Sequence, residues 1–155
     1  MRKIALSMAL LLAACRSGPA DQPAVVVFTP QELQRYTPQQ AVMAAASAAP
    51  QTVPGMFTMQ VKATGKERGR VFLNSELDYR DQRNLTVTIE PRAAKALAAR
   101  FGSPPDIFFK GKAIEVRGAA RRVTIGFFET GRPTGRYYYQ THVTVRGGDQ
   151  IRLMN

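Results

Sequence analysis

The sequence predicts a mainly β domain, a five-stranded barrel with one helix between strands three and four, preceded by a partly helical N-terminal linker. Three observations support this fold class. Apolar and polar residues alternate with a period of two in several stretches after residue 56, as in strands with one buried face. The period becomes helical between residues 91 and 101. Glycine-containing or polar segments separate the periodic stretches, as turns do.

The first three strands are expected over residues 57–63, 71–73 and 85–89. In the first of them, Phe57, Met59 and Val61 alternate with polar residues, so one face is apolar. Gly65 and Gly69 mark the turn that leads to the second strand. The three strands therefore read as a continuous antiparallel run.

The helix is expected to end at Gly102, because glycine readily takes the left-handed conformation that follows a helix. A loop, Ser-Pro-Pro-Asp, then leads to a fourth strand that points Ile114 and Val116 inward and Glu115 outward. The apolar phase shifts between residues 118 and 122, which predicts a β-bulge or a bend there.

A last strand or strand pair is expected from Tyr137 to Leu153, interrupted at residues 147–149. Its alternation predicts one polar face and one core face. The polar face would carry Arg136, Tyr138, Gln140, His142, Thr144 and Arg146. The core face would carry Tyr137, Tyr139, Val143 and Val145.

The order of strand, strand, strand, helix, strand, strand over residues 56–154 resembles the OB-fold. The resemblance implies a ligand surface on strands two and three, with the loops joining strands one to two and four to five. Basic groups beside aromatic rings suit a single-stranded nucleic acid or an acidic glycan. The candidate ligand-binding residues are Lys66, Arg68, Arg70, Phe128, Arg132, Arg136 and Tyr138. A second interpretation makes Phe127 and Phe128 core residues and the arginines a solvated rim.

The net charge of +11 indicates attraction to anionic surfaces without choosing among them. The N-terminus has the profile of an export signal, since Arg2 and Lys3 precede an apolar run over residues 4–12. Loss of residues 1–14 would remove those two positive charges and leave +9.

Leu12-Ala13-Ala14 precede Cys15, the one cysteine of the chain, and this segment resembles the lipobox of bacterial lipoproteins. The resemblance implies cleavage before Cys15 and a diacylated cysteine as membrane anchor. Because Arg16 and not Asp follows the cysteine, it also implies sorting to the periplasmic face of the outer membrane. An ordinary cleaved signal with an incidental Cys15 is the other interpretation.

Residues 15–55 are rich in Ala, Pro and Gln, which predicts a lipidated tether with two short helices. Each helix would begin at a Thr-Pro pair, after Thr29 and after Thr37, with Glu or Gln placed for a capping box. The second would stop at Pro50. The preceding Val25–Phe28 stretch predicts an edge strand.

Residues 74–84 connect strands two and three and are predicted to form a solvated hairpin tip. Asn74 and Ser75 would bond nearby backbone groups, and the acidic residues would pair with the arginines across the hairpin. A calcium loop built from Glu76, Asp78 and Asp81 is the alternative.

No sequence motif pairs His142 with a nucleophile, and no cofactor is predicted. The acids and arginines also do not match exported OB-fold nucleases position by position.

Two functions therefore follow from the sequence. The first is an envelope-anchored, non-enzymatic binding module for an anionic ligand. The second is a structural or assembly lipoprotein that binds another envelope protein through its edge strands and helical linker.

Overall fold

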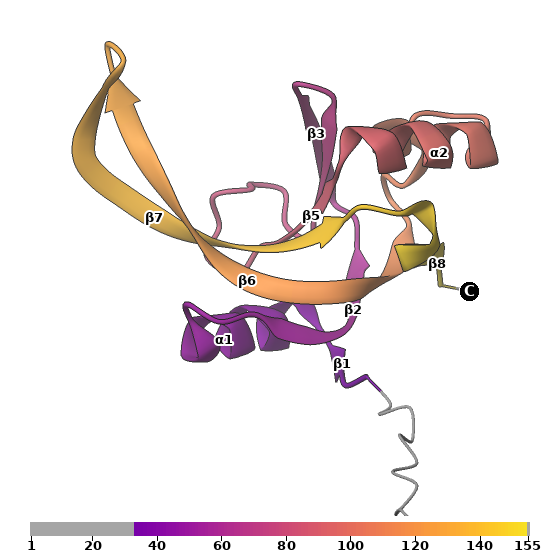
Figure 1. Cartoon of the computed structure of the whole chain (residues 1–155), viewed down its shortest axis with the longest axis horizontal. Helices are drawn as coiled ribbons and strands as arrows, with labels where there is room; N and C mark the ends of the chain where they lie inside the picture. Colours follow the sequence, from indigo (N-terminus) through magenta and orange to yellow (C-terminus); the bar gives the residue numbers. More distant parts are fainter. Residues whose placement is uncertain (1–32, 155) are drawn as a thin grey trace, which may run out of the picture. The chain divides into compact units, whose positions relative to one another are not determined.

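The computed structural model describes residues 33–154, which belong to one compact unit. This part of the chain is mainly β (Figure 1). Its strands are β1 Arg35–Tyr36, β2 Val53–Gln60, β3 Ala63–Glu67, β4 Arg70–Asn74, β5 Leu85–Ile89, β6 Ala113–Glu129, β7 Arg132–Val145 and β8 Ile151–Leu153. Its helices are α1 Pro38–Ala48, α2 Pro91–Phe101 and the one-turn α3 Pro105–Phe108. No helix in these described residues is long and apolar enough to span a membrane.

The strands form one mixed sheet in the order β1-β2-β6-β7-β5-β4-β3, with β8 also paired to β6. The β1–β2 and β5–β7 pairs are parallel and the others antiparallel. Only two residues separate β2 from β3. The N–H of Val61 donates to Lys112, whereas the N–H of Lys62 donates to Asn74. The chain thus changes partner from the β6 side to the β4 side within those two residues.

The predicted number of five strands differs from the eight in the described residues. The expected strand over 57–63 is divided between β2 and β3 at the change of partner. Two short strands, β1 and β8, add further pairs to β2 and β6. The helix predicted after Pro91 is present with Gly102 left-handed at its end, but the following predicted loop contains α3.

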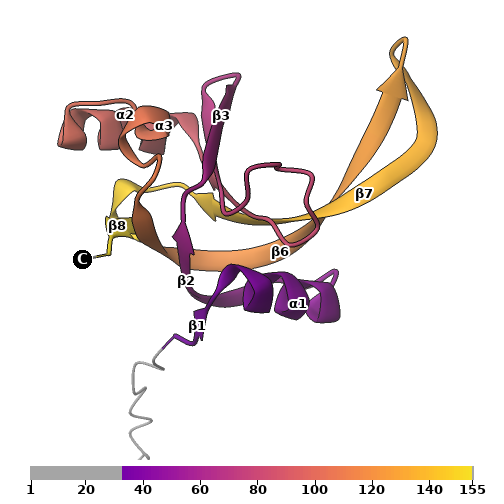
Figure 2. The same cartoon turned by 180° about the vertical axis from the view of Figure 1, so that it is seen from behind.

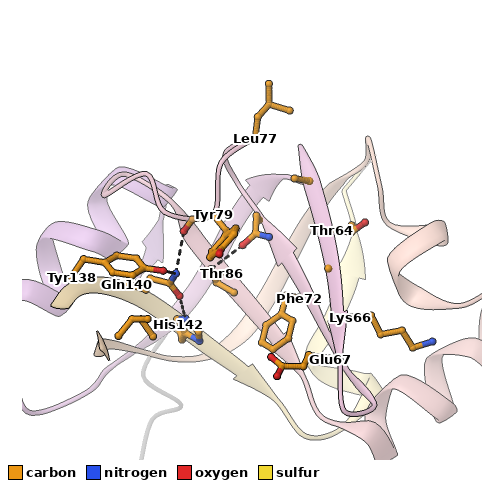
Figure 3. A pocket seen from close by; sticks show the side chains of 14 residues that line it. Thr64, Lys66, Glu67, Phe72, Leu77, Tyr79, Thr86, Tyr138, Gln140 and His142 are labelled. Carbon is orange, nitrogen blue, oxygen red and sulfur yellow. Dashed lines mark hydrogen bonds between the residues drawn. The ribbon is translucent and has the colours of Figure 1, made fainter. Parts of the chain in front are cut away.

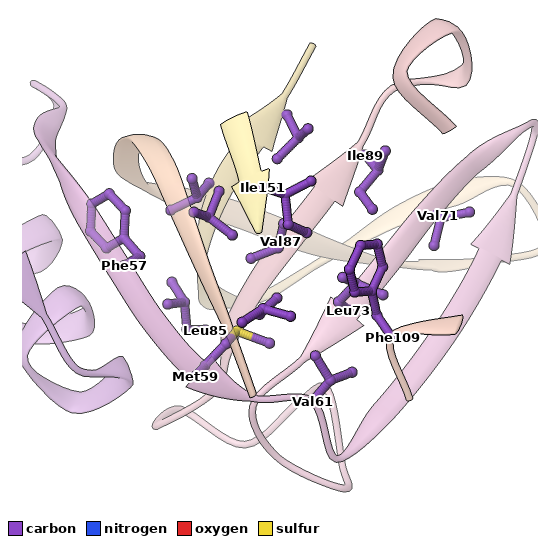
Figure 4. Packing of buried hydrophobic residues seen from close by; sticks show 14 of the residues in the cluster. Phe57, Met59, Val61, Val71, Leu73, Leu85, Val87, Ile89, Phe109 and Ile151 are labelled. Carbon is purple, nitrogen blue, oxygen red and sulfur yellow. The ribbon is translucent and has the colours of Figure 1, made fainter. Parts of the chain in front are cut away.

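The hydrophobic core lies inside the curve of the sheet, where side chains of β2, β4, β5 and β8 meet (Figure 4). Its largest fully buried apolar side chains are Phe57, Phe109, Leu73, Leu85, Ile89, Leu97, Ile114 and Ile151. Phe57, Met59 and Val61 are buried as their alternation predicts, and Val143 and Val145 lie on the core face of β7. The burial of these apolar side chains is the main stabilising contribution to the fold.

Helix α1 is part of the folded unit, in contrast to the predicted tether over residues 15–55. Its predicted N-terminus is confirmed, because Thr37 and Gln40 form a capping box and Pro38 occupies the first turn. Ala41 and Ala45 are fully buried where the helix packs under β2 and β6 (Figure 1). Small side chains allow this close approach to the sheet, which the Ala-rich composition alone did not reveal.

The chain just before α1 is also docked on the sheet. The Tyr36 ring of β1 stacks on Phe57 with the centroids 5.4 Å apart. A Cβ on Gly55 would lie 2.6 Å from that ring, so glycine is required there. The predicted first helix began at Thr29, outside the described residues, and residues 35–36 are strand. Val25–Phe28 and Cys15 also lie outside the described residues.

Strand β6 carries no bulge at residues 118–122, so that part of the prediction is wrong. Its register with β2 is continuous up to Ala120, and its pairing with β7 starts at the same residue. The apolar phase shifts because the strand changes partner there, and Val123 and Ile125 face the other side of the sheet. The observed irregularity lies between Gly126 and Phe128.

Glu115 was predicted to point outward but is only 2% exposed. Arg35 of β1 and Arg152 of β8 both bind its carboxylate. The two short strands that flank β2 and β6 cover this side chain, and a buried carboxylate requires such partners.

The β6–β7 hairpin extends beyond the core (Figures 1 and 2). Tyr137 and Tyr139 lie on this extension and are 59% and 41% exposed, so their predicted core position is wrong. Their face of the strand is as predicted, but no helix or opposing strand covers it at this distance from the core within the described residues. Phe128, at 69% exposed, is likewise not a core residue.

Candidate functional site: an aromatic groove and an adjoining polar pocket

A groove of about 640 Å³ opens on the face of the sheet opposite the core (Figure 3). Strand β3 forms one wall, and Leu77 and Tyr79 from the loop between β4 and β5 stand at the rim. The floor residues are Phe72, Asn74, Thr86, Ile125, Tyr138, Gln140 and His142. The groove therefore combines apolar rings with a polar strip along β7.

The strand register explains why these residues meet. Phe72 pairs with Thr88 across β4 and β5, Thr86 pairs with His142 across β5 and β7, and Ile125 pairs with Tyr138 across β6 and β7. Directly paired residues point to the same face of a sheet, and alternate residues along each strand do so too. Side chains far apart in the sequence thus share one surface.

The polar strip is a chain of hydrogen bonds along the floor (Figure 3). His142 Nε2 lies 2.7 Å from the Oε1 of Gln140, and His142 Nδ1 lies 3.1 Å from the Thr88 hydroxyl. An amide oxygen only accepts, so Nε2 carries the proton and Nδ1 accepts from Thr88. The Gln140 amide nitrogen donates to the Tyr138 oxygen and to the Tyr79 carbonyl.

The charge state of His142 follows from this position. Burial, and secondly the positive charge of Arg121, lowers the pKa of His142 from 6.5 to about 4. The imidazole is therefore neutral at pH 7. Burial also raises the pKa of Tyr138, so the floor of the groove carries no charge at that pH.

A smaller, polar pocket of about 210 Å³ adjoins the groove, and Phe72 and His142 line both. Its other lining residues are Arg70, Thr88, Glu90, Arg121 and Thr144. The Nε of Arg70 donates to Glu90 over 3.3 Å. Arg121 faces His142 across the β6–β7 pair. The pocket therefore combines two guanidinium groups with one carboxylate and two hydroxyl groups.

The rim loop, residues 75–84, is held by a buried amide. Asn84 Nδ2 donates to Asn74 Oδ1 and to Thr86 Oγ1, and its Oδ1 accepts from the Glu76 N–H. Ser75 Oγ accepts from the Leu85 N–H. The predicted connection is present and Ser75 bonds the backbone as predicted, but Asn74, Ser75 and Asn84 are buried and not solvated, and the Asn74 side chain accepts from the side chains of Asn84 and Thr86.

The charged residues of this loop do not pair across the hairpin as predicted. Asp78 binds Arg80 and Asp81 binds Arg83, each two residues along the chain, and Glu76 binds Lys62. The side-chain hydrogen bond from Arg83 lowers the pKa of Asp81 to about 2. Among the described residues, no three acidic, His or Cys side chains gather as metal ligands would. The carboxylates of the alternative calcium loop are instead each bound to a basic side chain.

The structure brings only some of the predicted ligand residues together. Tyr138 and Lys66 line the groove, although the Lys66 side chain points away from it (Figure 3). Arg70 lines the polar pocket. The other four line neither: Arg68 lies in the β3–β4 turn, and Phe128, Arg132 and Arg136 lie on the β6–β7 hairpin.

The aromatic and basic residues of the site that the sequence prediction missed are Phe72, Tyr79 and Arg121, whereas His142 lies on the polar face of the last strand as predicted. Phe72 and Arg121 could have been found from alternation, because each follows a core residue by one position. Tyr79 gave no such signal, because it belongs to an irregular loop whose position depends on Asn84.

These features define a mainly β domain with an open aromatic groove beside a basic pocket. The chain matches no family model and no curated protein. It is similar to solved structures of a putative aspartyl-tRNA synthetase from Leishmania major Friedlin, with 14% identity and a TM-score of 0.42, and of the aspartyl tRNA synthetase from Entamoeba histolytica, with 15% identity and a TM-score of 0.44. The matches cover 85% and 96% of this chain but only 23% and 28% of those proteins. Similarity at this level assigns neither a family nor an activity.

Proposed function

We propose that this chain is a non-enzymatic binding module for an anionic polymer, and that the groove is its contact surface. The observation that carries the proposal is the groove itself, in which Phe72, Tyr79 and Tyr138 present aromatic side chains on a strongly basic chain. Aromatic rings stack on the rings of a polymer, and arginines attract its charges. A single-stranded nucleic acid and an acidic glycan both offer rings and negative charge.

The proposal involves binding without catalysis. Both ring nitrogens of the single histidine are engaged, one with Thr88 and the other with Gln140. The lowered pKa of His142, about 4, makes its imidazole a weak base at pH 7, since an efficient general base has a pKa near the working pH. His142 therefore supports the shape of the groove, and its neutrality keeps the floor apolar enough for stacking.

We also propose that the described unit is an OB-fold-like barrel of five main strands. The support is the connectivity: β2 runs on into β3 after two residues, β5 is parallel to β7, and α2 joins β5 to β6. Counting β2 and β3 as one strand reproduces the predicted order. The groove then lies on the surface that the OB-fold resemblance implies for ligands.

The location of the module is part of the proposal. We infer from the lipobox-like segment that Cys15 anchors the chain to the outer membrane, and that the described unit acts in the envelope. An envelope location provides acidic glycans and phospholipids as anionic neighbours, and it exposes the module to any nucleic acid outside the cytoplasm.

The binding proposal is tested by paired tyrosine variants. Tyr79→Ala and Tyr138→Ala should each weaken binding of a labelled oligothymidylate or of heparin, since a stacked ring contributes roughly 1 to 3 kcal/mol. Tyr137→Ala is the matched control, because Tyr137 is an exposed tyrosine on the opposite face of β7. Equal losses in the three variants, or no binding by the wild type, would contradict the proposal.

The assembly role is the second candidate, and one observation favours it. The predicted basic residues do not share one pocket, since Arg68, Arg132 and Arg136 lie outside both. In addition, Tyr137 and Tyr139 form an exposed aromatic pair away from the groove, with Arg122 over the Tyr139 ring. Exposed Tyr and Arg side chains are enriched where proteins bind each other. Unchanged oligonucleotide binding by Tyr137→Ala together with loss of a co-purifying partner would support this role.

A further inference from the structure

We propose that the polar pocket is a phosphate seat, and that the ligand of the groove is a single-stranded nucleic acid. The seat is defined by Arg70, Arg121 and Thr144, beside Thr88, whose hydroxyl donates to His142. It presupposes the binding function proposed above and narrows the ligand to one chemical class.

The phosphate seat lies directly beside the groove. The groove and the pocket share Phe72 and His142, so a ligand that fills the groove reaches the pocket directly. The floor and rim of the groove carry aromatic rings, while the pocket is lined by charged and hydroxyl groups. A suitable ligand therefore carries a flat ring next to an anionic group.

The phosphate seat has an excess of positive charge. Arg121 forms no ion pair with a carboxylate in the described part of the chain. The Arg70 contact with Glu90 uses Nε, and no bond from its terminal nitrogens is seen within residues 33–154. Guanidinium groups bind phosphate oxygens well, because their N–H groups form a planar fork. Two guanidinium groups thus face one carboxylate, and the remaining positive charge suits an anion.

The positive charge of Arg121 acts on the groups that line the polar pocket. Its positive charge is the second cause, after burial, of the lowered His142 pKa. The neutral imidazole contributes no charge of its own, so Arg70 and Arg121 supply the attraction for an anion at pH 7.

The groove and the polar pocket together match a nucleic acid better than an acidic glycan. In a nucleic acid every aromatic base is joined to a phosphodiester, which matches an aromatic groove beside an arginine pocket. The sugar rings of an acidic glycan are saturated, so they can pack on Phe72 or Tyr79 only through their C–H groups, whereas a base offers a flat π-face for stacking. The combination of the two pockets therefore favours nucleic acid over glycan.

The test uses the full-length protein and a labelled oligothymidylate in titrations at several salt concentrations. Arg121→Gln should weaken binding about tenfold, the usual range for a lost charged hydrogen bond. It should also reduce the slope of log affinity against log salt by about 0.7, the value for one phosphate contact on a single strand. Glu90→Gln should strengthen binding, because it removes the carboxylate that opposes the phosphate.

Arg122→Gln is the matched control. Arg122 is the neighbouring residue on β6, is also exposed, and lies over the Tyr139 ring on the opposite face. The substitution removes the same charge, so binding should change less than about twofold, as expected for a charge outside the contact surface. Thermal melting of the three variants would identify any that fail to fold, and Glu90→Gln gives a second measurement of opposite sign.

The outcomes separate the two proposals. Equal effects of Arg121→Gln and Arg122→Gln would overturn the phosphate seat but leave the groove as a binding surface. Tighter binding to heparin than to the oligonucleotide would overturn the assignment to nucleic acid. An abasic oligonucleotide should bind more weakly than oligothymidylate and retain its dependence on Arg121. If the wild type binds no anionic polymer, both proposals fail.

Discussion

At the scale of single residues, His142 and Asn84 show how polar side chains support this fold. Both are drawn into hydrogen bonds on the groove side of the sheet, where a buried polar group needs partners. Neither is distinguished by a sequence motif. Their roles follow from which strands and loops lie beside them.

The first prediction is a pH effect on stability through His142. Its pKa is about 4 in the folded protein, against an ordinary value of 6.5 for an exposed histidine, as in the unfolded chain. Between these values the unfolded chain binds a proton that the folded chain does not. The free energy of unfolding should therefore fall by roughly 3 kcal/mol as pH drops from 7 to 4, the change expected for this shift.

Urea unfolding of the wild type and of His142→Gln at pH 7 and pH 4 measures this effect. The glutamine variant cannot bind the proton, so its stability should decline less over that range. Carboxylates such as Asp81 titrate in both proteins and cancel in the difference. Parallel declines in the two proteins would show that His142 is not shielded from protonation.

A second prediction concerns the amide that holds the rim loop. Asn84→Ala should lower the free energy of unfolding by roughly 1 to 3 kcal/mol, because it leaves buried polar groups of the loop without a partner. It should also weaken oligonucleotide binding, since Tyr79 belongs to that loop. Arg83→Ala is the control in thermal melts, and it should change stability little because its pair with Asp81 is exposed. An unchanged melting temperature for Asn84→Ala would contradict the assigned role.

At the scale of elements, α1 and the β6–β7 hairpin differ most from the sequence prediction. The helix was assigned to a tether but contributes two buried alanines to the core. The hairpin was expected to be half core but carries exposed tyrosines. The secondary structure of α1 was predicted correctly and its partner was not, whereas residues 126–136, expected as the loop between strands four and five, are largely strand, because β6 continues to Glu129 and β7 begins at Arg132. Periodicity shows which face of an element is apolar, but not whether another element covers it.

A third prediction tests whether α1 is a core element. Ala45→Leu should destabilise the folded unit by roughly 1 to 3 kcal/mol, because the added atoms do not fit where the helix packs on the sheet. Ala46→Leu is the matched control, as Ala46 is exposed on the same helix. Chemical unfolding of the two variants gives the comparison. Similar stabilities would restore the interpretation of this segment as a dispensable tether.

At the scale of the whole chain, the sequence predicts a secreted, lipid-anchored protein, and the structure describes only its folded unit. The proposed phosphate seat and the proposed anchor are independent of each other. Their experiments therefore address different parts of the chain.

The fourth prediction concerns the anchor. Cys15→Ser should abolish lipid attachment, because the lipobox resemblance makes this cysteine the acylated residue. Fractionation should then move the protein from the membrane to the soluble or unprocessed fraction. Mass spectrometry of the mature wild-type chain checks the same point, and an unmodified Cys15 there would disprove the anchor. Oligonucleotide affinity should be the same with and without the substitution.

The sequence by itself determined the mainly β class, the α2 helix and its Gly102 end, the cap of α1, and the buried positions of β2, β5 and β7. Of β7, this holds only for the positions of Val143 and Val145. These features depend on local propensity and on the period of apolar residues, which a single strand or helix expresses on its own. Only the tertiary structure decided that Glu115 is buried between two arginines, that Tyr139 is exposed, and that Arg121 meets Arg70 in one pocket. Such positions depend on strand register and on which elements cover each face, and these are set by contacts between residues far apart in the chain.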